Sequence, residues 1–278
     1  MTFSSRTPSV MGILNVTPDS FSDGGLYLAQ DKAVEHAYDM ISKGASIIDI
    51  GGESTRPGYE IITPGEELGR ILPVIRELKD SNAFLSVDTY KYDVAKPAIE
   101  GGCRILNDIN GLRDTEGLNK GRLAADNGAY VVLMYNRRLI EGGKDVIADA
   151  RQSLSRSVDI ALDAGVSEDK ILIDPGIGFG TTRSEDRRLT LELAGINPAS
   201  FPILYACSRK RFISCLDFGE DKDATWVVNM VAVANGAEAI RVHDPEPFEK
   251  YMDLYIEGED AASNLALAEE VILRTELS

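Results

Sequence analysis

Acidic and amide side chains recur where short apolar runs of this sequence end. Asp49 lies at the end of SIIDI, Asp88 closes FLSVD and Asp174 closes ILID. Asn15 and Asn107 occupy the equivalent place after VMGIL and RIL. Because a carboxylate accepts two parallel hydrogen bonds, Asp88, Asn107 and Asp174 suit a flat heterocycle with neighbouring N–H donors. An Asp at such a place can instead be an ordinary helix N-cap.

Cationic side chains follow several of the same runs. Arg56, Arg241 and His243 suit an anionic group such as a phosphate or diphosphate. Asn15 suits a metal-bound anion, since Mg²⁺ takes oxygen ligands and often shares them with phosphates. Lys210 is long enough to reach across a shared pocket. The alternatives left open are a surface role for Arg56, a structural histidine at position 243 and a solvated cation at position 210.

Short apolar runs alternate with amphipathic segments along the whole chain. We expect strands over residues 10–16, 46–50, 84–87, 104–106, 130–134, 171–173, 203–205 and 239–242. We expect helices over residues 31–43, 64–79, 92–100, 114–127, 144–164, 184–194, 224–235 and 245–256. Four of these helices should end on a glycine, at Gly44, Gly101, Gly128 and Gly165.

Eight strand–helix pairs in about 250 residues predict an α/β fold, a single-domain (β/α)₈ TIM barrel that spans residues 1–278. A doubly wound sheet is the alternative. The barrel predicts functional residues at the carboxyl ends of strands, where the acids and amides stand. Residues 257–278 are acidic and then apolar at helical spacing, so this C-terminal extension either prolongs the last helix or packs on a partner.

The amino-acid composition argues against several classes of protein, among them nucleic-acid-binding and membrane proteins. A net charge of −16 argues against nucleic-acid binding through a general basic surface. No segment approaches the ~20 apolar residues of a membrane span, so no membrane association is expected. The N-terminus lacks the apolar stretch of a signal peptide, and three cysteines form no paired framework. A reduced, cytoplasmic setting is predicted, with Cys207 and Cys215 as small apolar fillers.

Seven motifs in order identify a known family. MGILNVTPDSFSDGG, IDIGGESTRPG, SVDTYK, ILNDING, DPGIGFG, SRK and RVHD closely resemble dihydropteroate synthases, from about Met11 to His243. The resemblance implies a TIM barrel, usually a homodimer, that acts in folate biosynthesis. It implies the joining of 4-aminobenzoate to (7,8-dihydropterin-6-yl)methyl diphosphate. Because diphosphate leaves well once Mg²⁺ and cations balance its charge, we expect an SN1-like displacement with electrostatic rather than covalent catalysis.

The resemblance also assigns roles to residues. Those that would bind the pterin are Asp88, Asn107, Ile109, Met134, Asp174 and Lys210. Those that would bind 4-aminobenzoate are Thr55, Pro57, Phe179, Ser208 and Lys210. Those that would bind diphosphate are Asn15, Arg56, Arg241 and His243, with Mg²⁺ at Asn15. The residues expected to carry catalysis are Lys210, Asp88, Asp174, Arg241 and His243. Asp49 would support the first two loops, and residues 22–25 would form a lid.

The sequence departs from the family pattern around strands five to seven. Tyr135 stands where a histidine is expected, Thr181 follows DPGIGFG where the family usually has a lysine, and Arg211 stands where a small residue is typical. Nearby arginines would supply replacement charge or be solvated. These departures leave open a pterin-binding paralogue with a non-synthase binding or regulatory role. A barrel transferase for a folate methyl group is a third, weaker hypothesis.

Overall fold

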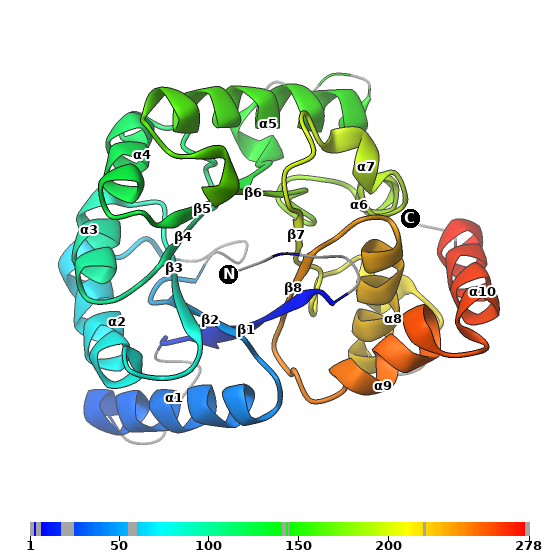
Figure 1. The fold of residues 1–278 in the computed structure, drawn as a ribbon, viewed down its shortest axis with the longest axis horizontal. Coiled ribbons are helices and arrows are strands. Elements are labelled where there is room, and N and C mark those ends of the chain that lie inside the picture. Colours follow the sequence, from blue (N-terminus) through cyan, green and yellow to red (C-terminus); the bar gives the residue numbers. More distant parts are fainter. Residues whose placement is uncertain are drawn as a thin grey trace.

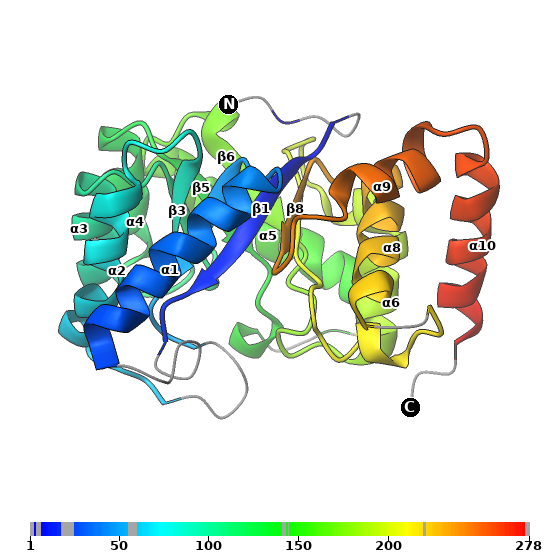
Figure 2. The ribbon, with the colours of Figure 1, turned by 90° about the horizontal axis from the view of Figure 1, so that it is seen from below.

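Eight parallel strands form an inner barrel, and helices surround it (Figure 1). The computed structural model describes residues 3, 7–17, 25–54, 60–140, 143, 145–218 and 221–275, without the side chains of residues 25–28 and 221–222. The predicted (β/α)₈ barrel is therefore confirmed, and the doubly wound sheet is wrong. Seen from the side, the helices stand around the barrel as a single outer layer, with α10 outside it (Figure 2).

The strands follow one another around the barrel in an order that closes on itself. Their bounds are β1 Ser9–Asn15, β2 Ile47–Gly51, β3 Phe84–Asp88, β4 Ile105–Asp108, β5 Tyr130–Met134, β6 Ile171–Asp174, β7 Leu204–Tyr205 and β8 Ala239–Val242. The order in the sheet is β6-β5-β4-β3-β2-β1-β8-β7. The predicted bounds of β5 and β8, the starts of β3 and β6 and the end of β7 are confirmed. The remaining predicted ends differ by one or two residues.

The barrel has its weakest backbone pairing at the seam between β6 and β7, where the sheet closes. β7 has two residues, and it meets β6 through an isolated parallel bridge between Ile173 and Ile203. There the Ile173 amide donates to the Pro202 carbonyl oxygen at 3.0 Å. The barrel therefore closes on this side with far less backbone pairing than between its other strands.

Each strand is followed by a helix that packs on its outer face. The helices are α1 Gly25–Ser42, α2 Pro64–Leu78, α3 Tyr92–Glu100, α4 Gly117–Asp126, α5 Val146–Asp163, α6 Arg183–Leu191, α7 Leu193–Ile196, α8 Asp221–Ala234, α9 Phe248–Met252 and α10 Ala261–Arg274. Among the described segments none of these helices is both long and apolar enough to cross a membrane.

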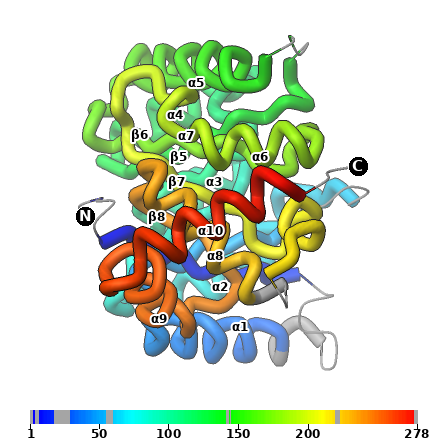
Figure 3. Tube along the Cα trace, turned by 90° about the vertical axis from the view of Figure 1, so that its right-hand side faces the viewer, coloured from blue at the N-terminus to red at the C-terminus, as the bar shows by residue number. Residues whose placement is uncertain are grey.

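The chain after β8 departs from the predicted single helix over residues 245–256. α9 is short and continues into a π-helix over Asp253–Glu257. Gly258 then takes an extended conformation, with φ −74° and ψ 167°, which ends the helical run. α10 starts again at Ala261 and crosses the outside of α8 (Figure 3). Ala268 and Ile272 of α10 are buried, so the tail forms a helix of its own against the barrel wall.

Glycines end four of the helices as predicted. Gly44, Gly128 and Gly165 have φ values of 98°, 60° and 93°, in the left-handed region that glycine adopts readily. Gly101 keeps a helical φ of −76°, and its neighbour Gly102 takes the left-handed value of 129°. The predicted helix end at Gly101 is therefore confirmed, and the chain takes its left-handed turn at the second glycine of the pair.

A buried lysine fixes the segment after β4. Lys120 of α4 is fully buried and donates to Asp108 Oδ2 at 2.6 Å, Asp114 Oδ2 at 2.7 Å and the Tyr90 carbonyl at 2.8 Å. Asp108 is also buried and accepts from the Leu112 amide at 3.1 Å. Burial raises the pKa of Asp108, whereas the ammonium of Lys120 lowers it. The lysine thus compensates a carboxylate that the fold has removed from water.

We expect Lys120→Met to lower the free energy of unfolding by about 3–5 kcal/mol, because it leaves the Asp108 carboxylate buried and uncompensated. Urea unfolding followed by the fluorescence of Trp226, the one tryptophan of the chain, measures the change. Lys43→Met is the control, since Lys43 forms an i,i+4 pair with Asp39 on the protein surface and should leave the unfolding midpoint unchanged. Equal midpoints for both variants would contradict the expectation.

Candidate active site

The inside of the barrel changes from apolar to polar over two residues in four of the strands, β2, β4, β6 and β8. Ile47, Ile105, Val132, Leu172 and Ala239 belong to a buried apolar cluster. Two positions further along the same strands stand Asp49, Asn107, Met134, Asp174 and Arg241. Side chains alternate faces with a period of two, so both sets point into the barrel and the second set lies nearer its carboxyl end. The apolar layer therefore forms a floor beneath a polar pocket.

Arg241 joins two acids across the floor of this pocket. Its Nε donates to Asp49 Oδ2 at 2.6 Å, and its Nη2 donates to Asp88 Oδ2 at 2.7 Å. Asn107 Nδ2 also donates to Asp49 Oδ2, at 2.9 Å. Four of the predicted site residues, from β2, β3, β4 and β8, are thus brought into one hydrogen-bonded group.

Each of these two acids keeps one oxygen unused. Asp49 Oδ1 and Asp88 Oδ1 are buried, and neither has a hydrogen-bond partner among the described residues. Burial raises the pKa of Asp88 to about 7, and the nearby Asp49 charge adds to this, while Arg241 opposes it. Asp88 is therefore poised between its charged and neutral forms near neutral pH, and its free oxygen can accept a hydrogen bond from a ligand.

Asp174 and Lys210 lie on the opposite side of the pocket. Asp174 is buried at the end of β6, and its Oδ1 accepts from the Gly176 amide at 2.7 Å. Burial raises the pKa of Asp174, and the Lys210 ammonium works against that rise. Burial lowers the pKa of Lys210, and Asp174 counters this effect. Lys210 Nζ lies 4.9 Å from the ring centre of Phe179.

The segment after β7 holds its polar residues in an unusual backbone conformation. Arg209, between Ser208 and Lys210, has a φ of 58°, in the left-handed region that non-glycine residues seldom adopt. Ser208 Oγ lies 2.9 Å from Nδ1 of His243, at the end of β8. Such strain persists only where surrounding contacts fix it, and it is common at functional sites. It turns Ser208 and Lys210 toward the same pocket.

The other predicted site residues divide into two groups. Asn15 ends β1 and is partly buried, Ile109 follows β4 and is partly buried, and Met134 ends β5 and is buried. The expectations for Thr55, Arg56 and Pro57, and for most of the proposed lid over residues 22–25, lie outside the described residues. The structure therefore assembles the pterin, Lys210 and His243 sides of the predicted site.

A partly buried lysine to which the sequence assigned no role connects residues on either side of the segment after β2. Lys91 Nζ donates to Glu53 Oε2 at 2.6 Å, to Glu67 Oε2 at 2.8 Å and to the Ile62 carbonyl at 2.8 Å. Glu53 also accepts from the Ile62 amide at 2.8 Å. The residue stands in the SVDTYK motif, but its spacing to Glu53 and Glu67 gives no sign of this contact before the barrel is built.

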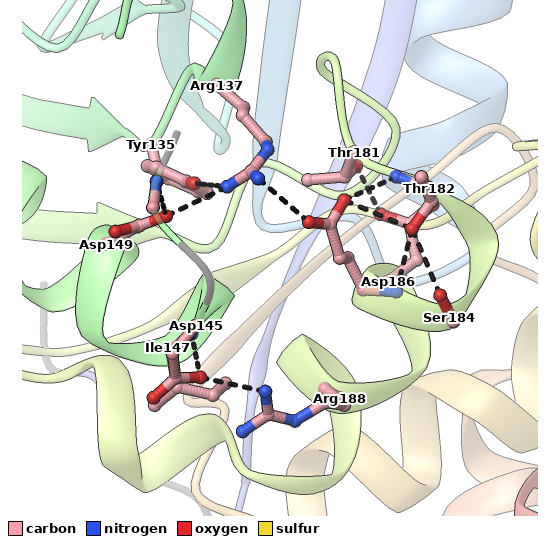
Figure 4. Close-up of polar contacts among 12 residues, drawn as sticks. Tyr135, Arg137, Asp145, Ile147, Asp149, Thr181, Thr182, Ser184, Asp186 and Arg188 are labelled. Atoms are coloured by element: carbon pink, nitrogen blue, oxygen red, sulfur yellow. Dashed lines mark hydrogen bonds and ion pairs between the residues drawn. The ribbon is translucent and has the colours of Figure 1, made fainter. Parts of the chain in front are cut away.

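The divergent residues after β5 and β6 form a connected network of their own. Tyr135 is fully buried, and its hydroxyl accepts from Arg137 Nη1 at 3.1 Å. Arg137 also pairs with Asp149 at 3.1 Å (Figure 4). Its second ion pair is with Glu185, at 3.0 Å. Arg188 pairs with Asp145 at 2.8 Å. These two arginines therefore hold α5 against α6.

Comparison with known proteins agrees with this geometry. A family model described as "Pterin binding enzyme" matches residues 11–243. The chain is 44% identical to the dihydropteroate synthase of Bacillus subtilis over 239 residues, which cover 84% of this chain and 83% of that protein. It is 41% identical to the enzyme of Mycobacterium leprae over 251 residues, 84% of this chain and 88% of that protein.

Solved structures show the same architecture. The dihydropteroate synthase of Clostridium difficile, determined in the presence of pteroic acid, superposes with a TM-score of 0.83 at 34% identity, covering 99% of this chain and 100% of that one. The Xanthomonas albilineans enzyme in complex with 7,8-dihydropteroate gives a TM-score of 0.81 at 33% identity, covering 91% and 94%. By its motifs, its barrel and these similarities, the chain belongs to the dihydropteroate synthase family of pterin-binding enzymes.

Proposed function

We propose that this chain condenses (7,8-dihydropterin-6-yl)methyl diphosphate with 4-aminobenzoate to give 7,8-dihydropteroate and diphosphate. The observation that carries the proposal is the buried, unpartnered Asp88 Oδ1 beside Asn107, in a pocket that Asp174 faces from the other side. Buried acceptors without partners are costly, and the flat edge of a pterin offers neighbouring N–H donors to satisfy them. The relatives named above catalyse this reaction, and one neighbour holds its product.

The residues of the pocket act by position and charge. Asp88, Asn107 and Asp174 hold the pterin by its N–H and ring edges, and Lys210 lies against the ring. The carbon–oxygen bond to diphosphate then breaks with its electron pair on the leaving group, which Arg56 and His243 stabilise. The amine nitrogen of 4-aminobenzoate donates its lone pair to the exocyclic methylene and then loses a proton to solvent. No covalent enzyme intermediate is needed.

The role proposed here for Arg241 differs from direct diphosphate binding. The sequence assigns it to diphosphate, whereas its guanidinium is already paired with Asp49 and Asp88. We propose that it chiefly holds Asp88 in place for the pterin, and that its positive charge acts on the diphosphate through space. At short range in a partly buried site, such a charge is weakly screened.

The proposed Mg²⁺ fits this pocket only as a partner of the substrate. Among the described residues no group of three or more His, Cys, Asp or Glu side chains forms a metal site. Asn15, at the end of β1, offers one amide oxygen. Mg²⁺ commonly takes a single protein ligand with phosphates and water, so Asn15 would hold the ion together with the diphosphate. When bound, the ion would neutralise charge on the leaving group.

Two further expectations belong to the same proposal. Homodimer formation rests on the resemblance and is tested by light scattering on the purified protein. A cytoplasmic location rests on the sequence. A binding or regulatory paralogue without synthase activity is not favoured, because the chain shares over 40% identity with several synthases.

The direct test measures diphosphate release and dihydropteroate formation from the two substrates with Mg²⁺ present. The proposal expects both products in equal amounts. Tight binding of the pterin diphosphate with no diphosphate release would overturn the synthase function and favour the binding paralogue.

We expect Lys210→Ala and Asp174→Asn each to lower kcat/KM at least about a hundredfold, since each removes a charged contact made to the reacting pterin. Steady-state kinetics measure the loss, and circular dichroism checks that the fold is kept. Lys170→Ala is the matched control, because Lys170 precedes β6 at the other end of the barrel, beside Tyr130. A variant with near-normal rates would remove that residue from the proposed site.

Binding of the pterin should depend on pH through Asp88. The raised pKa of about 7 means that Asp88 is neutral below this value and a carboxylate above it. We expect 6-hydroxymethyl-7,8-dihydropterin, which carries no diphosphate, to bind at least about tenfold more tightly at pH 8 than at pH 5.5. Calorimetric titration measures the affinities. Asp88→Asn should bind weakly at both pH values, and a pH dependence that survives this substitution would assign the titration to another group.

A further inference from the structure

Two consecutive arginines after β5 have opposite environments. Arg137 is mostly buried, and it forms ion pairs with Asp149 of α5 (Figure 4) and with Glu185 of α6. These two carboxylates balance its charge. Arg138 is exposed, and its side chain has no carboxylate within ion-pair distance among the described residues. The second arginine is therefore the one whose charge can serve a ligand.

The backbone holds Arg138 in a fixed place beside the pocket. The amide of Arg137 donates to the Phe179 carbonyl at 3.1 Å, and the amide of Arg138 donates to Asn136 Oδ1 at 3.1 Å. Asn136 in turn donates to the Ile109 carbonyl at 3.1 Å. Gly180, with a φ of 83°, lies so close that a Cβ there would stand 2.8 Å from Cγ of Arg138. The segment after β5 is thus pressed against the segment after β6.

Two cations consequently lie against one aromatic ring. The guanidinium carbon of Arg138 is 5.4 Å from the ring centre of Phe179, and Lys210 Nζ is 4.9 Å from it. The partly buried lysine interacts with Asp174 inside the pocket, whereas the arginine is open to solvent. The Phe179 ring therefore lies near two positive charges, that of Lys210 toward the pocket and that of Arg138 toward solvent.

The shape of 4-aminobenzoate matches this arrangement. Its amine and carboxylate lie at opposite ends of a rigid ring, and the amine must face the pterin deep in the pocket. The carboxylate then points outward, toward the rim. A chain with a net charge of −16 repels an anion unless a local cation receives it. A guanidinium suits this task, because its planar donors match a carboxylate.

We propose that Arg138 binds the carboxylate of 4-aminobenzoate at the rim of the pocket and so sets the preference for an anionic amine substrate. This inference rests on the proposed synthase function and names a substrate contact that the motifs do not assign. Phe179 supports the ring of the substrate, and Arg137 holds the segment that carries Arg138.

The test compares Arg138→Gln with the wild-type protein on charged and neutral ligands of one shape. We expect the KM for 4-aminobenzoate to rise about tenfold, as for loss of a hydrogen bond to a charged group, while kcat and the KM for the pterin diphosphate stay within about twofold. The inhibition constant of 4-aminobenzamide, the neutral amide, should not change. Arg138→Lys, which keeps the charge without the planar donors, should give an intermediate KM.

Arg104→Gln is the matched control, since Arg104 is an exposed arginine just before β4, at the other end of the barrel. A KM for 4-aminobenzoate in Arg138→Gln equal to that of Arg104→Gln would overturn the inference. Equal weakening of 4-aminobenzoate and 4-aminobenzamide would also overturn it, because the arginine would then not read the carboxylate. A wild-type protein that forms no dihydropteroate would instead refute the proposed synthase function.

Discussion

Two buried carboxylates share one guanidinium, and the polar end of this barrel depends on that pairing. Asp49 and Asp88 come from neighbouring strands, and Arg241 reaches both from β8. Removing one partner of such a group leaves the others charged in a medium that solvates them poorly. The same contacts orient Asn107 through Asp49 and leave one oxygen of Asp88 without a partner. Under the proposed function, the residues that stabilise this end of the barrel are therefore also those that bind the pterin.

The positions of the pocket residues could be predicted from the sequence, whereas their partners could not. A period of two along each strand and the rule that function lies at the carboxyl ends of barrel strands place Asp88, Asn107 and Asp174 correctly. The partners of Arg241 are 192 and 153 residues away along the chain. Residue type suggests an anion for this arginine, and only the closed barrel shows that carboxylates of the protein itself already occupy it.

The contacts of two lysines with little solvent exposure could not be predicted from the sequence. Lys91 and Lys120 look like ordinary charged residues near the start of helices, where solvent exposure is the usual outcome. Each instead crosses between segments that meet only in the folded chain, and each finds two carboxylates there. A local sequence pattern indicates the secondary structure that one segment prefers. The contacts of these lysines depend on how several segments pack together.

The segments after β5 and β6 differ from the family pattern, whereas the motifs that contain Asp88, Asn107 and Asp174 are kept. Tyr135 is buried, and its hydroxyl meets the arginine that joins α5 to α6. Thr181 and Asp186 form a separate hydrogen bond at 2.5 Å, and Asp186 also accepts from the Gly178 amide. The sequence identifies Tyr135 and Thr181 as departures from the family pattern. Their partners, Arg137 and Asp186, become clear only from three-dimensional contacts.

The boundary between β6 and β7 is the part of the barrel wall with the least backbone pairing. Asp174 stands on one side of that seam and Lys210 on the other, and a single backbone bridge spans it. The distance between these two side chains is therefore set less by the sheet than by outer contacts such as Thr190 with Tyr205, whose hydroxyls lie 2.6 Å apart. The relative placement of Asp174 and Lys210 therefore depends on side-chain packing between α6 and β7 as well as on the sheet.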